Sequence, residues 1–157
     1  MPTRHFVDTL KVLKAGSLLG LDILRAVVVL AVANRRLRTA EARNLLTSSS
    51  GEGEPAMELS EARRRLVSRV AYVVPRMGRR VPWRSDCLVQ ALAARRWLTG
   101  HGIATNLHIG TRKTPGKGFE AHAWLTVADV VVTGWDINGF AQFDAFPAQL
   151  NDGPNEN

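Results

Sequence analysis

One cysteine and a distant histidine are the residues of this chain whose types and spacing could do chemistry. Cys87 is the only cysteine among the 157 residues, and His122 lies further along in Ala121-His122-Ala123-Trp124. A cysteine thiolate attacks carbonyl carbon, and an imidazole can take the thiol proton and later return it to a leaving group. The pair therefore predicts nucleophilic catalysis.

The expected surroundings of Cys87 favour the thiolate. A free cysteine thiol has a pKa of about 8.5, so it needs help to ionise at neutral pH. The sequence predicts a helix that begins at Ser85 or Asp86, either of which could cap it, so that Cys87 lies in the first turn. Unpaired N–H groups and the helix dipole stabilise an anion there. Asp86 opposes the anion unless its carboxylate caps the helix.

A catalytic imidazole also needs an orienting group. The candidates are Asp129, Asp136, Asn138 and Asp144. A three-residue turn over 128–130 would place Asp136 opposite His122 and the Trp124 ring over Gly134. A two-residue turn would place Trp135 opposite His122 instead. We prefer the first register and predict Asp136 as the third catalytic residue.

A tetrahedral intermediate needs hydrogen-bond donors for its oxygen. The backbone N–H of Cys87 is one candidate, and the Gln90 amide and the Trp83 indole are two more. Gln90 is equally typical of a plain surface residue. These positions are predicted only as oxyanion or positioning groups.

Both chemical residues also fit a purely structural interpretation. Cys87 could be a small buried hydrophobe, and His122 a core histidine bonded to a backbone carbonyl. A metal site would draw on Cys87, His101, His108 and His122, but no two of them have the close spacing of known zinc motifs. We therefore expect neither a metal nor a cofactor.

Composition predicts one domain in a reducing cytoplasm. Lys and Arg number 21 against 14 acidic residues, which leaves a net charge of +7. A single cysteine cannot form an internal disulfide. The arginines crowd 35–43, 63–69 and 76–84 and could attract nucleic acid, anionic lipid or an acidic peptide, or merely solvate helix faces. Trp83 is the one aromatic residue within these ranges, and this scarcity argues against a base-stacking surface for nucleic acid.

The pattern of apolar residues predicts helices first and an antiparallel sheet afterwards, an α+β class. An N-terminal helical region (1–46) contains one or two helices over 8–45, with Leu10, Leu13, Leu18, Leu21, Leu24 and Val28 at helical spacing. A flexible linker (47–56), a core (57–150) and a disordered tail (151–157) follow. Within the core we expect helices from Ser60 to Pro75 and from Ser85 or Asp86 to Leu98, and strands over 103–111, 119–127 and 130–135.

The stretch 18–33 is mostly apolar but contains Asp22 and Arg25. It is shorter than the ~20 apolar residues of a membrane span and comes too late for a secretory signal. We expect a helix that packs on the domain or lies on a membrane surface.

Three blocks of sequence, in this order and spacing, resemble one known family. They are Pro82-Trp83-Arg84-Ser85-Asp86-Cys87-Leu88-Val89-Gln90-Ala91-Leu92-Ala93-Ala94, Gly102-Ile103-Ala104-Thr105-Asn106-Leu107-His108-Ile109-Gly110, and Gly118-Phe119-Glu120-Ala121-His122-Ala123-Trp124. Over about 60–146 the chain resembles the lasso peptide biosynthesis B2 proteins, which share their domain with the C-terminal half of the microcin J25-processing protein.

The resemblance implies a transglutaminase-like cysteine peptidase fold and removal of the leader from a ribosomally made precursor peptide. Cys87 would be the nucleophile, His122 the base and an aspartate on the next strand the third member, a role that Asp136 suits. Many relatives have a Glu where this chain has Thr126, and the segment that follows is variable, so the aspartate is the weakest match.

The resemblance also implies partners. Residues 1–56 have a helix-and-linker pattern rather than the strand-rich pattern of the family's leader-recognition domain, so a separate recognition protein is expected. A macrolactam cyclase of the asparagine-synthetase type would act next. Two alternatives stay open, namely acyl transfer to an amine and a non-catalytic basic adaptor.

Overall fold

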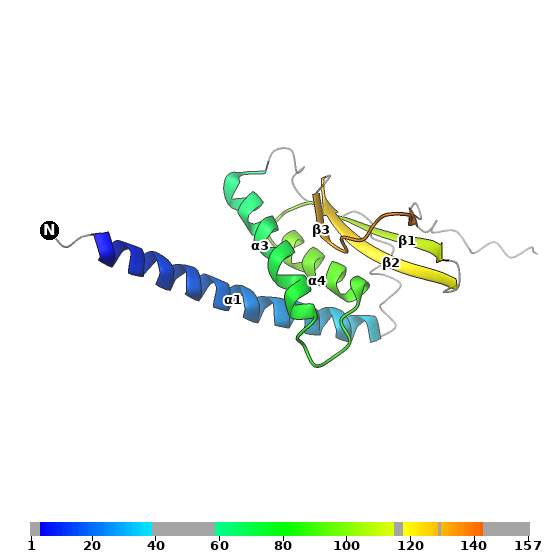
Figure 1. The fold of residues 1–157 in the computed structure, drawn as a ribbon, viewed down its shortest axis with the longest axis horizontal. Coiled ribbons are helices and arrows are strands. Elements are labelled where there is room, and N and C mark those ends of the chain that lie inside the picture. Colours follow the sequence, from blue (N-terminus) through cyan, green and yellow to red (C-terminus); the bar gives the residue numbers. More distant parts are fainter. Residues whose placement is uncertain (1–3, 39–58, 115–117, 129, 143–157) are drawn as a thin grey trace, which may run out of the picture.

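The computed structural model describes residues 4–38, 59–114, 118–128 and 130–142, with backbone alone for 4–18, 114 and 142. Within these residues three helices are followed by four strands (Figure 1). The predicted α+β class is confirmed. The predicted linker and tail lie outside the described residues, as do Asp129 and Asp144.

Helix α1 (Arg4–Arg38) is one continuous helix. Its last turn carries Arg35, Arg36 and Arg38, cations that the negative end of the helix dipole favours. Its second half packs into the body of the protein through small and branched residues, which are Ala26, Val29, Leu30 and Ala33. A second helical segment at 39–43, which the sequence allowed, lies outside the described residues.

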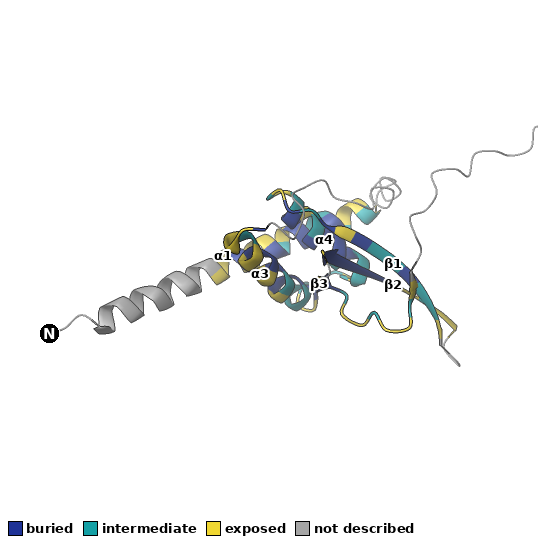
Figure 2. Ribbon diagram, turned by 90° about the horizontal axis from the view of Figure 1, so that it is seen from above, coloured by how far each residue is buried: buried dark blue, intermediate teal, exposed yellow. Residues whose placement is uncertain are grey.

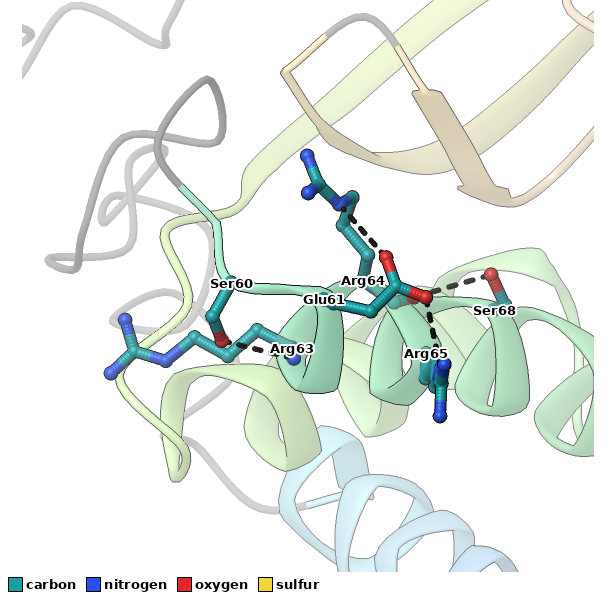
Figure 3. Close-up of polar contacts among 6 residues, drawn as sticks. All are labelled: Ser60, Glu61, Arg63, Arg64, Arg65 and Ser68. Atoms are coloured by element: carbon teal, nitrogen blue, oxygen red, sulfur yellow. Dashed lines mark hydrogen bonds and ion pairs between the residues drawn. The ribbon is translucent and has the colours of Figure 1, made fainter.

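Helix α3 (Glu61–Gly78) begins at the predicted cap. The Ser60 hydroxyl accepts a hydrogen bond from the Arg63 backbone N–H at 3.4 Å, and Arg65 Nε donates to Glu61 at 2.9 Å (Figure 3). The hydrogen bond from Arg65 is the main cause that holds the pKa of the Glu61 carboxyl below its usual range. The start of α3 is thus built from exposed, local contacts.

The predicted end of this helix at Pro75 is wrong. Pro75 lies inside α3, which continues to Gly78. Proline removes one backbone donor and crowds the carbonyl four residues earlier, which disfavours a helix without forbidding it. Here Val73, Val74 and Met77 pack into or against the core, and their burial keeps the last turn helical.

Helix α4 (Cys87–Thr99) is the central helix. Its buried residues lie on more than one side of the helix, because α1, α3 and the sheet all pack on it. They are Val89, Ala91, Leu92, Ala93, Ala94, Trp97 and Leu98. Arg95 is half-buried, and this burial lowers the pKa of its guanidinium.

The sheet is antiparallel, with the order β3-β2-β1-β4. Its strands are β1 (Asn106–Thr114), β2 (Gly118–Val127), β3 (Val130–Thr133) and β4 (Ala141–Gln142). Strand β1 begins later than predicted, β3 ends two residues before the predicted 135, and the short β4 was not predicted.

The helices cover one face of the sheet (Figure 1). Leu107 of β1 and Leu125 and Val127 of β2 belong to the same core as the buried residues of all three helices. Figure 2 shows burial concentrated where the sheet meets α4, while the far end of the β1–β2 hairpin is more exposed. Of the helices described, none combines the length and apolarity that a membrane span requires.

Candidate functional site

Cys87 is the first residue of α4, and its neighbours build the start of that helix. Asp86 is the cap, and its Oδ1 accepts from the Val89 backbone N–H at 3.2 Å. Its Oδ2 lies 3.4 Å from Arg84 Nε. The Asp86 carboxylate therefore caps the helix, which was one of the two caps that the sequence predicted. The Cys87 side chain itself is half-buried.

The two residues predicted as oxyanion donors, Gln90 and Trp83, lie near this helix start and differ in their hydrogen bonding. Gln90 Nε2 donates to the Ser85 carbonyl at 2.8 Å and sits against Gly78, where a Cβ would lie 2.9 Å from that nitrogen. The Gln90 side chain thus packs against the end of α3 while its amide bonds the residue before the cap. Trp83 packs against the core, and its buried Nε1 has no hydrogen-bond partner among the described residues.

His122 lies on β2, half-buried, and its ring is held by a backbone carbonyl. Nε2 lies 3.3 Å from the Gly134 oxygen. Because a carbonyl only accepts, Nε2 carries the proton and Nδ1 of the neutral ring keeps a lone pair. This geometry leaves Nδ1 available as a base, and it is also the contact that the structural interpretation of His122 predicted.

Aromatic rings form a row along this face of the sheet. The His122 ring lies 6.1 Å from Trp124 and 5.0 Å from Phe140, and Trp124 lies 5.4 Å from the ring of His108. His108 Nε2 is 2.9 Å from Thr126 Oγ1. The row, His108-Trp124-His122-Phe140, restricts the rotation of the His122 ring.

The β2–β3 connection differs from both registers that the sequence suggested. Val127 pairs with Val130, so two residues separate the strands and the preferred three-residue turn is wrong. An irregularity then adds one residue on β3, and Leu125 opposes Thr133. Beyond this bulge the alignment is the one that the longer turn would have produced.

Two glycines, Gly134 and Gly110, make room for the Trp124 side chain. A Cβ on Gly134 would lie 2.8 Å from Trp124 Cβ, so Gly134 is the neighbour of Trp124 that the sequence predicted. The indole ring, however, lies over Gly110 of β1, where a Cβ would lie 3.1 Å from Cη2 and Cζ3. Our prediction of the ring over Gly134 is wrong, because the side chain leans toward β1.

Asp136 faces a guanidinium. Its Oδ2 lies 3.9 Å from Arg112 Nη2, and the Asp136 side chain is 74% exposed. Arg112 also donates to Glu120 at 3.1 Å and to the Asn138 carbonyl at 3.0 Å, and it lies over the Phe140 ring. Arg112 thereby fastens the segment after β3 to strands β1 and β2.

The structure brings His122 together with Gly134, Trp124 and Phe140. Between the described residues, no hydrogen bond joins the Cys87 sulfur or the Asp136 carboxylate to the His122 ring. His122 shares its face of the sheet with Trp124, whereas the alternate residue Leu125 packs in the core with α4. His122 therefore lies on the face of β2 opposite to the one that packs on α4, and although α4 and β2 contact each other, the structure does not bring the described Cys87 and His122 side chains together.

A metal has no evident place here. In the part of the chain that the structure describes, no three His, Cys, Asp or Glu side chains are grouped so that they could hold an ion.

Comparison with known protein families shows which family this chain belongs to. A family model described as the transglutaminase-like superfamily matches residues 24–144. The chain belongs to this superfamily. The match spans α4 and β2, and with them Cys87 and His122, and it begins inside α1. The superfamily generally includes cysteine peptidases. Neither the curated proteins nor the solved structures compared with the chain include a match.

Sequence reasoning missed the Gly134 carbonyl and Phe140 as neighbours of His122, and Arg112 as the partner of Asp136. A glycine directly after a β-rich run was the one available signal for the first, because such a glycine often marks a close backbone approach. Phe140 gave no signal because it lies in the irregular segment after β3. Arg112 gave none because its contacts with Asp136 and Asn138 are made to that segment.

Proposed function

We propose that this chain is a cysteine peptidase that removes the leader from a ribosomally made, lasso-type precursor peptide. The observation that carries the proposal is that the superfamily match spans both a thiol at a helix start and an imidazole on the adjacent sheet. The sequence blocks around Cys87 and His122 resemble the lasso B2 proteins, which supports the narrower assignment.

In the proposed reaction, Nδ1 of His122 takes the proton of Cys87 and the thiolate attacks the scissile carbonyl carbon. The tetrahedral intermediate collapses, and His122 protonates the departing amine of the core peptide, which leaves the leader as a thioester on Cys87. Water then gives a proton to His122 and attacks the thioester, which releases the leader acid and restores the thiol.

This reaction requires the sulfur and Nδ1 to come within hydrogen-bond reach. Catalytic hydrogen bonds are often absent or long before substrate binds and tighten in the complex. The Gly134 carbonyl supports the proposal because it occupies Nε2 and leaves Nδ1 for the thiol.

We propose Asp136 as the third member, acting by its charge on the imidazolium from a position two residues after Gly134. Asp136→Asn keeps the shape and removes the charge, whereas Asp136→Ala removes both. If the charge acts, both variants lower kcat to a similar extent. An unchanged kcat in Asp136→Asn would remove Asp136 from the reaction and leave the Gly134 carbonyl as the orienting group.

For the oxyanion, the backbone N–H of Cys87 and the Trp83 indole are the donors we propose. The unpartnered Nε1 of Trp83 supports its role, and the engagement of Gln90 with Ser85 makes Gln90 the less suitable donor. Trp83→Phe keeps most of the packing and removes the N–H, so a lower kcat at unchanged KM would identify an interaction made in the transition state.

The decisive experiment is incubation of a candidate precursor peptide with the protein, followed by mass spectrometry. Hydrolysis yields a leader fragment and a core fragment, and Cys87→Ala yields neither, with an unchanged circular dichroism spectrum. Cleavage that persists in Cys87→Ala would refute the mechanism. The superfamily match also supports acyl transfer to an amine, and that reaction would yield a product linked to the amine instead of a free leader acid.

The proposal includes two partners, a separate leader-recognition protein and a macrolactam cyclase. The net charge of +7 supports a role for the arginine-rich helices in binding the recognition protein or an acidic leader. A pull-down in low salt should retain the recognition protein and lose it in high salt, because exposed charges are screened. Failure to retain it at low salt would contradict this part of the proposal.

A further inference from the structure

The outer side of α1 carries an apolar stripe. Leu21, Leu24 and Val28 are 63%, 62% and 52% exposed. They are three and four residues apart, so they lie on one side of the helix. The residues of α1 that enter the core lie on another side, and they are Ala26, Val29, Leu30 and Ala33. Leu21 and Leu24, which belong to the helical pattern of leucines in the sequence, therefore lie outside the core.

The charged side chains on this part of α1 are nearly all positive. Between residues 19 and 38 its only acidic residue is Asp22, which is buried and lies 3.5 Å from Arg69 of α3. Arg35 follows Leu24 by three helical turns and continues the stripe, and Arg38 lies one turn further. Both arginines are exposed. The described outer surface of α1 thus combines large apolar side chains with cations.

The first part of α1 lies outside the residues that match the superfamily. The superfamily match begins only at residue 24. Residues 4–23 of the helix precede it, and the N-terminal portion of α1 projects away from the other elements, whereas Asp22 already contacts α3 (Figure 1). At 1.5 Å a residue this part is about 30 Å long. The superfamily match therefore does not account for this part of the helix.

We propose that α1 docks lengthwise on an anionic lipid surface, with the stripe Leu21, Leu24 and Val28 among the lipid chains and Arg35 and Arg38 against the headgroups. An apolar stripe and a basic cluster are the two signals that together hold a helix at such a surface. A second copy of the chain would instead bring together two surfaces of the same sign, on chains that each carry +7. The docking does not depend on the peptidase reaction.

Vesicle sedimentation tests the proposal. The protein should pellet with vesicles of mixed phosphatidylglycerol and phosphatidylcholine and stay in solution with phosphatidylcholine alone. The triple variant Leu21→Ser, Leu24→Ser, Val28→Ser should bind the mixed vesicles at least about tenfold more weakly, because three apolar groups are lost from the interface. Arg35→Gln with Arg38→Gln should also weaken binding, by an amount that shrinks as salt is added.

The matched control removes exposed apolar residues elsewhere. Phe119 and Val130 lie on the sheet and are 78% and 59% exposed, and Phe119→Ser with Val130→Ser should bind like the native protein. The proposal is overturned if the native protein ignores anionic vesicles, or if the control loses binding as much as the triple variant. It is also overturned if light scattering shows a dimer that the triple variant separates, since a second copy would then be the occupant.

Discussion

The start of α4 and the surroundings of His122 are built by different kinds of interaction. At the start of α4, the Asp86 carboxylate accepts from the Val89 N–H and the Gln90 amide donates to the Ser85 carbonyl, so each of these hydrogen bonds spans at most five residues of chain. Around His122 the partners lie 12 to 18 residues away from it along the chain. They are Gly134, Phe140 and, through Trp124, Gly110 and His108.

This difference teaches that the two proposed catalytic groups depend on different parts of the fold. The environment of the thiol follows from one short stretch of sequence and should survive distant changes. The environment of the imidazole depends on a bulge, a glycine and a row of rings that three segments supply. Variants at the sheet should therefore disturb the imidazole long before they disturb the thiol.

The largest expected effect is the difference in cleavage between variants of two histidines that lie on the same face of the sheet. In His122→Ala, cleavage of the precursor peptide should fall by about a thousandfold or more, because the base and acid of the reaction are lost. In His108→Ala, where the ring bonds Thr126 and stacks on Trp124, cleavage should stay within about tenfold of the native rate. Equal losses in steady-state assays of the two variants would mean that the row of rings, and not the imidazole of His122, matters.

A second test alters the glycine that holds the His122 ring. In Gly134→Ala the new Cβ would lie 2.6 Å from the Ala123 carbonyl oxygen, and the residue would keep a φ of 75°. We expect a loss of about 2–4 kcal/mol in the free energy of unfolding, measured with denaturant.

Gly118→Ala is the control for that variant. Its φ is 81°, but no atom of the described residues lies within 4 Å of the new Cβ, so the cost expected from them is that of the backbone conformation alone. We expect about 1 kcal/mol. If both glycine variants lose the same amount, close approach to Trp124 does not position β2 against the segment after β3.

At the other region, Asp86→Ala should lower the free energy of unfolding by about 1 kcal/mol, because the N–H at the start of α4 loses its acceptor. Ser60→Ala is the matched change on α3, where the cap is exposed and the bond is longer, 3.4 Å against 3.2 Å. Its loss should be smaller. Thermal melting of the two variants checks the order, and a larger loss in Ser60→Ala would contradict it.

The smallest effect is expected for Glu61→Gln at the start of α3, and it depends on pH. The pKa of Glu61 is lowered in the folded protein, mainly by the hydrogen bond from Arg65. The ionised carboxylate therefore stabilises the fold above the ordinary glutamate value of 4.5, and the contribution is lost as pH falls through the folded pKa. The Tm difference between native and variant should be present at neutral pH and vanish in acid. A difference that persists in acid would assign the effect to something other than charge.

Local patterns were sufficient for much of the fold. The caps at Ser60 and Asp86, the stop at Gly100 and the placement of β2 follow from residue types within a turn or a strand. The end of α3 did not, because the burial of Val73, Val74 and Met77 overrides the local preference of Pro75. The sides of α1 and α4 that are buried also did not follow, since they depend on which neighbours pack on each helix.

The sequence by itself determined the order of elements, the α+β class and the position of Cys87 at the head of a helix, because capping, periodicity and turn chemistry act over a few residues. Tertiary structure alone decided that the His122 ring leans on the Gly134 carbonyl, that Asp136 meets Arg112 and that Leu21, Leu24 and Val28 stay outside the core. The physical reason is that one added residue in a strand, or the choice of one helix face over another, is settled by the packing of distant segments.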